Sequence, residues 1–184
     1  MKSSTHRFAS ITLAVAMAAG ASAFAQVMVG GAPMYPTKDI IDNAVHSKDH
    51  TTLVAAVKAA GLVDTLKGPG PFTVFAPTND AFAALPDGTV DMLLMPENKA
   101  KLTTILTYHV VPGKLDAAML MQQIMAGKGM ASLKTAAGGT LTAKASGGKV
   151  MITDENGNTA TVTTADVIQS NGVIHVVDKV LLPR

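Results

Sequence analysis

Helix-forming and strand-forming patterns are separated along this chain. Up to about Met125, apolar residues recur mainly with the three- and four-residue spacing of helices; beyond it the sequence is rich in Thr, Val and Gly and contains short β-branched runs. Helices gathered ahead of antiparallel strands are typical of α+β proteins, whereas a parallel βαβ fold would alternate the two. We therefore expect one α+β domain in which helices pack on short strands.

Capping residues predict where several helices begin and end. Thr37 and Thr78 have side chains that can accept a hydrogen bond from the first helical turn, and Asp116 is placed to cap a Met-rich helix at residues 117–125. Gly61 follows an apolar stripe of helical spacing, at the position where a positive φ commonly ends a helix. These signals predict helices beginning after Thr37, Thr78 and Asp116 and one ending at Gly61.

Turn residues predict the strands. A Gly-Pro-rich turn leads into a strand at residues 72–76, and Asn156-Gly157 supplies the positive φ angles of a tight hairpin turn. The last strand lies within "NGVIHVVDKVLLP" (171–183), which is apolar except for two titratable side chains, His175 and Asp178. Because side chains alternate along a strand, these two point to opposite faces and cannot form an acid–base pair by themselves.

The first residues have the pattern of a secretory signal peptide. Lys2 and Arg7 precede an apolar run and a small-residue triplet that ends at Ala25, where we expect cleavage. The apolar run is shorter than the roughly 20 residues of a membrane-spanning helix, so a secreted or periplasmic protein is predicted, without membrane insertion. We expect the chain to divide into a signal peptide, a flexible lead-in and a folded domain, at residues 1–25, 26–36 and 37–184.

Charge and composition narrow the function classes. The net charge of +2 is matched by Lys2 and Arg7, so the exported part is neutral and has no basic footprint for nucleic acid. The chain has no cysteine, which excludes disulfides, a thiol nucleophile and cysteine metal clusters. No serine lies in a Gly-x-Ser-x-Gly elbow, and no phosphate-binding loop is present. We expect no enzymatic activity, no catalytic residue and no cofactor.

Histidines and methionines are the candidate metal ligands of this chain. His109 and His175 are both expected in apolar strands, so a two-histidine metal site is conceivable. A zinc site needs three or four ligands, and no further ligand lies nearby in the sequence. We therefore favour buried histidines that form hydrogen bonds within the fold. His46 and His50 are four residues apart, and a solvated turn is favoured there over a metal site. The Met-rich region offers thioether groups that could bind copper(I), but packing or a hydrophobic contact surface is the favoured interpretation. Its methionines are Met119, Met121, Met125 and Met130.

Three segments together resemble the fasciclin domain family: "FTVFAPTNDAF" (72–82), "YHVVPGKL" (108–115) and "NGVIHVVDKVLLP" (171–183). The resemblance covers residues 37–183. It implies a wedge of two small β-sheets with several packed helices. It also implies that a set of polar residues in the motifs are struts between strands and loops, namely Asn79, Asp80, His109 and His175.

The resemblance implies a function in adhesion or in contact with extracellular matrix or the cell envelope. The partner would be a surface or matrix protein or a polysaccharide, and self-association would raise the avidity of a single domain. By similarity to animal relatives, the candidate partner-binding residues are Tyr108, His109, Asp166 and Ile168. The alternative is a carrier of an apolar small molecule, carotenoid-like or lipid, with walls formed by the Met-rich helix and the lead-in.

Overall fold

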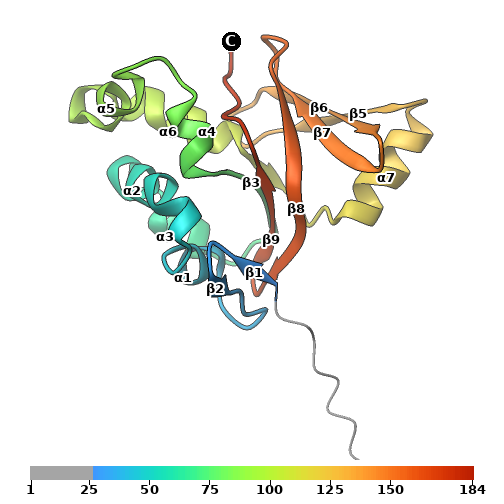
Figure 1. Cartoon of the computed structure of the whole chain (residues 1–184), viewed down its shortest axis with the longest axis horizontal. Helices are drawn as coiled ribbons and strands as arrows, with labels where there is room; N and C mark the ends of the chain where they lie inside the picture. The colour runs from blue at the N-terminus through green and yellow to red at the C-terminus, as the bar shows by residue number, and fades with distance from the viewer. Residues whose placement is uncertain (1–26) are drawn as a thin grey trace, which may run out of the picture.

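The computed structural model describes residues 27–184 of the chain. The predicted signal peptide therefore lies outside the described residues. Within the described part, no helix has the length and apolar character needed to cross a membrane. The architecture consists of helices gathered on one side of a bent sheet, with a single helix on the other side (Figure 1).

In residues 27–184 every helix precedes β5 (Met130–Lys134), and only strands follow. The α-helices are α1 (Ile40–Ala44), α2 (Thr51–Ala60), α3 (Val63–Lys67), α4 (Asn79–Ala83), α5 (Thr89–Leu94), α6 (Lys99–Tyr108) and α7 (Ala117–Ala126), with 3-10 turns η1 (Lys48–His50) and η2 (Pro96–Asn98). The strands are β1 (Met28–Val29), β2 (Ala32–Pro33), β3 (Phe72–Pro77), β4 (Val110–Pro112), β5 (Met130–Lys134), β6 (Thr140–Ser146), β7 (Lys149–Thr153), β8 (Thr159–Gln169) and β9 (Gly172–Val177).

Seven strands follow the order β4-β3-β9-β8-β7-β6-β5, and β1 and β2 form a separate hairpin. β3 and β9 are parallel, while the other neighbours are antiparallel. The long strand β8 belongs to two halves, because its first residues pair with β7 and the rest pair with β9 across two irregularities in register. The α+β prediction is confirmed, and the two small sheets of the expected wedge are joined through β8.

The core lies in two parts on opposite faces of β3 and β9. Val74 and Ile174 belong to an apolar cluster beneath α1, α2, α3 and α6, whereas Phe75 and Val177 belong to a second cluster with α7 and strands β5–β8. In Figure 1 the green and cyan helices cover the first face, and α7 packs on the strands at the far end. Strand alternation in β3 and β9 sorts their side chains between the two clusters.

Most predicted caps are confirmed. The side chain of Thr78 accepts from the amide of Ala81 at 3.3 Å, and Asp116 likewise caps α7 at a distance of 2.8 Å. Gly61 ends α2 with a φ of 71°. The first helix is different: its cap is Asp39 rather than Thr37, and the Asp39 carboxylate accepts from the amide three residues ahead.

The segment predicted as a flexible lead-in is instead packed into the fold. β1 and β2 form a two-stranded hairpin, and Val29, Ala32 and Met34 join the apolar cluster beneath the helices. The amide of Met34 also donates to the carbonyl of Val27 at 2.9 Å. The segment is ordered although its sequence has no regular hydrophobic pattern, because removing its apolar side chains from water stabilises the packed conformation.

The β7–β8 turn is shaped by Asp154 as well as by the predicted pair Asn156-Gly157. Of the predicted pair, only Gly157 has a positive φ, of 88°. The buried Asp154 carboxylate accepts from the amides of Asn156 and Asn158, at 2.9 and 2.8 Å, and from the amide of Leu182 at 3.0 Å. This carboxylate therefore shapes the turn and also fastens the C-terminal segment to it.

Candidate functional site

His175 is fully buried in β9 and links three segments. Its Nε2 donates to the carbonyl oxygen of Leu115 at 2.6 Å, and its Nδ1 accepts from the amide of Asp166 at 3.3 Å. Its ring also stacks on Phe75, with 5.7 Å between ring centroids. Burial lowers the pKa of His175, and this matches a neutral ring that donates through one nitrogen and accepts through the other.

His109, at the end of α6, bonds in the same way. Its Nδ1 donates to the carbonyl oxygen of Ile105 at 2.8 Å, and its Nε2 accepts from the amide of Leu181 at 2.9 Å. Burial lowers its pKa to about 4, so the ring is neutral near pH 7. Because both nitrogens of His109 and His175 are engaged with backbone, neither ring has a lone pair left for a metal ion.

Tyr108 is also turned inward, with no exposed side-chain surface. Its hydroxyl donates to the carbonyl oxygen of Thr140 at 3.0 Å and accepts from the amide of Glu155 at 3.1 Å. Burial raises the pKa of the phenol. Tyr108 and His109 therefore differ from the expectation of direct partner contact, since both sit in the core and tie α6 to the strands around it.

Asp166 and Ile168, in contrast, reach the surface. Asp166 is exposed at an irregularity of β8 and has a φ of 57°, a left-handed conformation that Asp tolerates better than most residues. Its carboxylate accepts from the amide of Ala117, at the first turn of α7, at 2.7 Å. Ile168 is half-buried two residues further along the strand. Of the four candidate partner-binding residues, these two are accessible.

The remaining predicted struts behave differently from each other. Asn79 is half-buried and joins α4 to the start of α2, because its Oδ1 accepts from the amide of Thr52 at 3.0 Å and its Nδ2 donates to the carbonyl of Lys48 at 2.8 Å. Asp80 is exposed on the first turn of α4 and, among residues 27–184, forms no side-chain hydrogen bond, so it differs from the predicted polar core. Asp178 likewise lies exposed just past β9.

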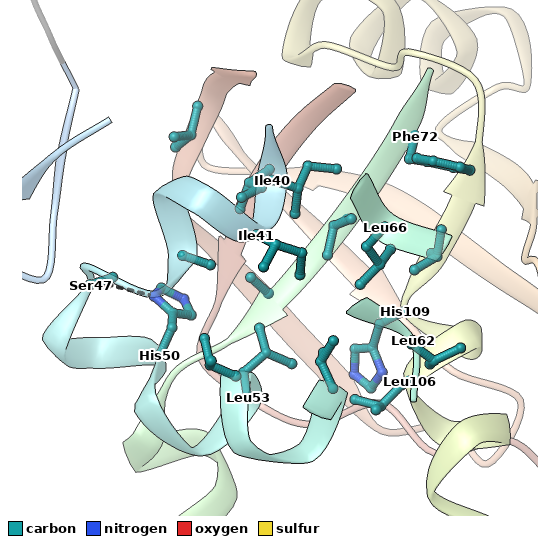
Figure 2. Close-up of a pocket in the computed structure, with 18 of the residues that line it drawn as sticks. Ile40, Ile41, Ser47, His50, Leu53, Leu62, Leu66, Phe72, Leu106 and His109 are labelled. Atoms are coloured by element: carbon teal, nitrogen blue, oxygen red, sulfur yellow. Dashed lines mark hydrogen bonds between the residues drawn. The ribbon is translucent and has the colours of Figure 1, made fainter. Parts of the chain in front are cut away.

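An apolar pocket lies between the helices and the sheet (Figure 2). Its accessible wall is entirely apolar, and its cavity volume is about 90 Å³. The wall comes from the β1–β2 hairpin, helices α1, α2, α3 and α6, and strands β3, β8 and β9, with representative residues Met34, Ile41, Leu53, Leu66, Leu106 and Ile174. The lead-in contributes to this wall as the carrier hypothesis predicted, but no residue of the Met-rich helix does.

His50 lies in the wall of this pocket and is only 3% exposed. Its Nδ1 is 2.9 Å from the hydroxyl of Ser47, whereas its Nε2 is the one buried side-chain nitrogen or oxygen in residues 27–184 without a hydrogen-bond partner. Burial lowers the pKa of His50; the nearby carbonyl of Ala76 opposes this, yet no bond of acceptable geometry forms between them. A buried polar atom without a partner is rare and calls for an explanation.

The prediction of a solvated turn was wrong for His50. His46 is exposed, but His50 precedes Leu53 and Val57 at intervals of three and seven residues, and these positions share the inward face of α2. That spacing is the signal in the sequence that places His50 on an apolar face. In the described residues, no group of three histidine, aspartate or glutamate side chains is arranged to hold a metal ion.

The methionines of the Met-rich region point mainly to solvent. Met119, Met125 and Met130 are 42%, 69% and 52% exposed, whereas Met121 packs against the second core cluster. Three of the four methionines thus lie exposed as individual side chains on α7 and β5, and a hydrophobic contact surface there stays a prediction.

Comparison with known proteins gives a consistent result. A family model described as "Fasciclin domain" matches residues 48–183. The chain is 54% identical to "Protein sll1483" of Synechocystis sp. over 92% of its own length and 87% of that protein. It is 36% identical to immunogenic protein MPB70 of Mycobacterium bovis, covering 76% of this chain and 66% of the relative.

Longer relatives contain a matching segment. The chain is 36% identical to transforming growth factor-beta-induced protein ig-h3 of Sus scrofa, covering 80% of this chain but 20% of that protein. A solved FAS1 domain pair from the insect cell adhesion molecule fasciclin I matches the fold with a TM-score of 0.69 and 20% sequence identity, over 79% of this chain and 51% of that one.

Proposed function

The chain belongs to the fasciclin domain family, and on this basis we propose that it is an exported, non-enzymatic binding module that mediates adhesion or contact with extracellular matrix or the cell envelope. The partner is a surface or matrix protein or a polysaccharide. One observation carries the proposal: the side-chain polar atoms of Tyr108, His109 and His175, which belong to the family motifs, form hydrogen bonds with the backbone of their own chain. Such motifs build a scaffold, and contact with a partner falls to the surface.

The proposed contact surface is the region of β8 around Asp166 and Ile168. Both residues are accessible, and Asp166, in a left-handed conformation, places its carboxylate at the start of α7. A charge close to a half-buried apolar side chain offers a partner both an orienting electrostatic contact and apolar area to bury. Buried Tyr108 and His109 act indirectly in this proposal, by holding the strands that carry the surface.

Charge removal at Asp166 tests this surface. Asp166→Asn keeps a hydrogen-bond acceptor for the amide of Ala117, and Asn also tolerates a positive φ, so the fold should be retained. Asp87→Asn is the matched control, since Asp87 is exposed in the loop before α5. In cells lacking the gene, complementation with Asp166→Asn should restore surface attachment less well than the wild type or the control, and crosslinking should capture less partner.

Export and self-association have separate tests. The intact mass of the protein released by its own cells should correspond to residues 26–184, and a mass that retains the first 25 residues contradicts cleavage after Ala25. Light scattering after size exclusion measures whether the domain self-associates, which would increase the avidity of a single-domain adhesin. Unchanged attachment after gene deletion, together with no captured partner, overturns the adhesion proposal.

A second candidate function is a carrier of an apolar small molecule. The apolar pocket beneath α1, α2 and α3 favours it. Its volume of about 90 Å³ is well below the roughly 300–1,000 Å³ of pockets that enclose drug-sized ligands, so the candidate cargo is a small molecule or the end of a longer chain such as a lipid or carotenoid. Native mass spectrometry of protein purified gently from its own cells tests this function through any added mass.

A further inference from the structure

We infer that the apolar pocket binds a small uncharged molecule with an apolar body and a single hydroxyl or carbonyl oxygen, and that this oxygen accepts a hydrogen bond from Nε2 of His50. This rests on the carrier function proposed above and names the ligand class for it. Three features of the pocket carry the inference: its apolar wall, the nitrogen without a partner, and the engagement of every nitrogen of the other histidine in the wall.

The first feature is the burial of Nε2 of His50. Removal of a polar atom from water without a replacement hydrogen bond is destabilising, so a leucine at this position would pack in the same wall at lower cost. Neighbouring buried histidines show the contrast, because His109 and His175 each use both ring nitrogens. A hydrogen-bond partner from outside the chain would satisfy Nε2, and histidine would then be preferable to leucine at position 50.

The bond on the other side of the ring allows Nε2 to be a donor. The hydroxyl of Ser47 lies 2.9 Å from Nδ1 and can donate to it, which leaves the proton of the neutral ring on Nε2. In this tautomer a ligand presents an acceptor to Nε2, which hydroxyl and carbonyl oxygens provide.

The wall excludes charged ligands. No Lys, Arg, Asp or Glu lines the pocket, so an ionised ligand would lose its hydration without gaining an ion pair. Figure 2 shows His50 beside Ser47 at one side of the pocket and His109 with Leu106 and Leu62 at the other. With His109 fully bonded, Nε2 of His50 is the buried side-chain polar atom in residues 27–184 that is left without a partner, and the other side chains of the wall are apolar except Ser47, Thr65 and Thr107.

The volume limits the size of the apolar body. An apolar cavity of about 150 Å³ in another protein accommodates benzene, and the cavity here is about 90 Å³. A ring or branch of a few carbon atoms is the expected occupant, or the oxygen-bearing end of a longer chain. Because Nε2 is covered by its neighbours, binding includes a small rotation of the His50 ring.

The test compares cyclopentanol with cyclopentane on the exported protein. The two probes have nearly the same apolar body, and only the alcohol offers an oxygen. Long-range proton–nitrogen NMR should show a saturable shift of the His50 Nε2 resonance with cyclopentanol, and no comparable shift of either His109 nitrogen. One added hydrogen bond predicts binding about three- to tenfold tighter for the alcohol. Equal binding of both probes, or no shift at His50, overturns the inference.

The variant His50→Leu provides a second readout. Because it removes Nε2, the preference for cyclopentanol over cyclopentane should disappear; its Tm is not the readout, since the buried hydroxyl of Ser47 loses its partner Nδ1 in the same change. His46→Leu is the control, since His46 is exposed on the same connecting segment and should leave the preference intact. A folded His50→Leu protein that still prefers cyclopentanol as strongly as this control would overturn the role of Nε2.

Failure of this inference and failure of the carrier function are distinguishable. Protein from its own cells that carries a pure hydrocarbon supports the carrier function but overturns the role of His50. Protein without added mass counts against the carrier function, whereas the NMR comparison still decides whether the pocket recognises an oxygen.

Discussion

Acidification should destabilise this protein through its buried histidines, and His109 allows the effect to be calculated. The pKa of His109 is lowered from 6.5 to about 4 by burial. In the unfolded chain the same ring takes up a proton below about pH 6.5. The unfolded state therefore binds more protons than the folded state between these two pH values, and the free energy of unfolding falls as the pH falls through that window.

The magnitude follows from the width of the window. Each pKa unit corresponds to about 1.36 kcal/mol, so the contribution of His109 that is fully present above pH 6.5 and lost by about pH 4 is roughly 3 kcal/mol. The geometry gives the same sign: Nε2 accepts from the amide of Leu181, and a protonated ring would turn two donors toward each other. Burial also lowers the pKa values of His50 and His175, so the total loss should exceed that of His109 alone.

Urea unfolding between pH 7.5 and pH 4 measures this loss in the wild type and in His109→Gln. The glutamine oxygen can still accept from the amide of Leu181 but cannot titrate. We expect the variant to lose about 1–3 kcal/mol at pH 7, because the bond to Ile105 is removed, and to depend on pH less steeply by roughly 3 kcal/mol across the window. His46→Gln, at an exposed position, is the control and should keep the wild-type slope. Equal slopes for His109→Gln and wild type, or an NMR titration of folded His109 near pH 6.5, would refute the reasoning.

Two further substitutions test the internal roles assigned to motif and turn residues. Tyr108→Phe should lower the free energy of unfolding by about 1–3 kcal/mol, because the carbonyl of Thr140 and the amide of Glu155 lose their partner; chemical denaturation measures this, and an unchanged stability would contradict the structural role. Asp154→Ala should cost at least about 2 kcal/mol, because three backbone amides lose a buried carboxylate acceptor, and hydrogen exchange should show faster exchange at Leu182; protection equal to that of the wild type would argue against this anchor.

Local signals predicted three of the helix ends and the class of fold. Thr78, Asp116 and Gly61 act within one helical turn, so the residues that they cap or terminate are their own neighbours in sequence. Alternation in β9 predicted which side chains share a face, since that depends only on the geometry of one strand. The cap at Asp39 was missed because Thr37 offered an equally acceptable side chain two residues earlier.

Predictions that depended on distant partners were less successful. The exposure of Asp80 and the burial of Tyr108 follow from how α4 and α6 dock against other elements, and no neighbour in sequence specifies this. The lead-in looked unstructured because Val29 and Met34 find their apolar contacts on helices and strands far along the chain. Three motifs identified the family correctly. Of the candidate contact residues taken from the family, however, two are buried, one is half-buried and one is exposed.

The amino-acid order alone was enough to define an α+β domain, its helix caps and its fasciclin motifs, because periodicity and capping are properties of short stretches of backbone. Which histidine has unused hydrogen-bonding capacity was settled only by folding. His109 and His175 are completed by amides and carbonyls up to 72 residues away, whereas His50 is brought into an apolar wall where no such group reaches its Nε2. Hydrogen bonds to distant backbone exist only once the chain has packed, and for this reason the candidate ligand site is a product of tertiary structure.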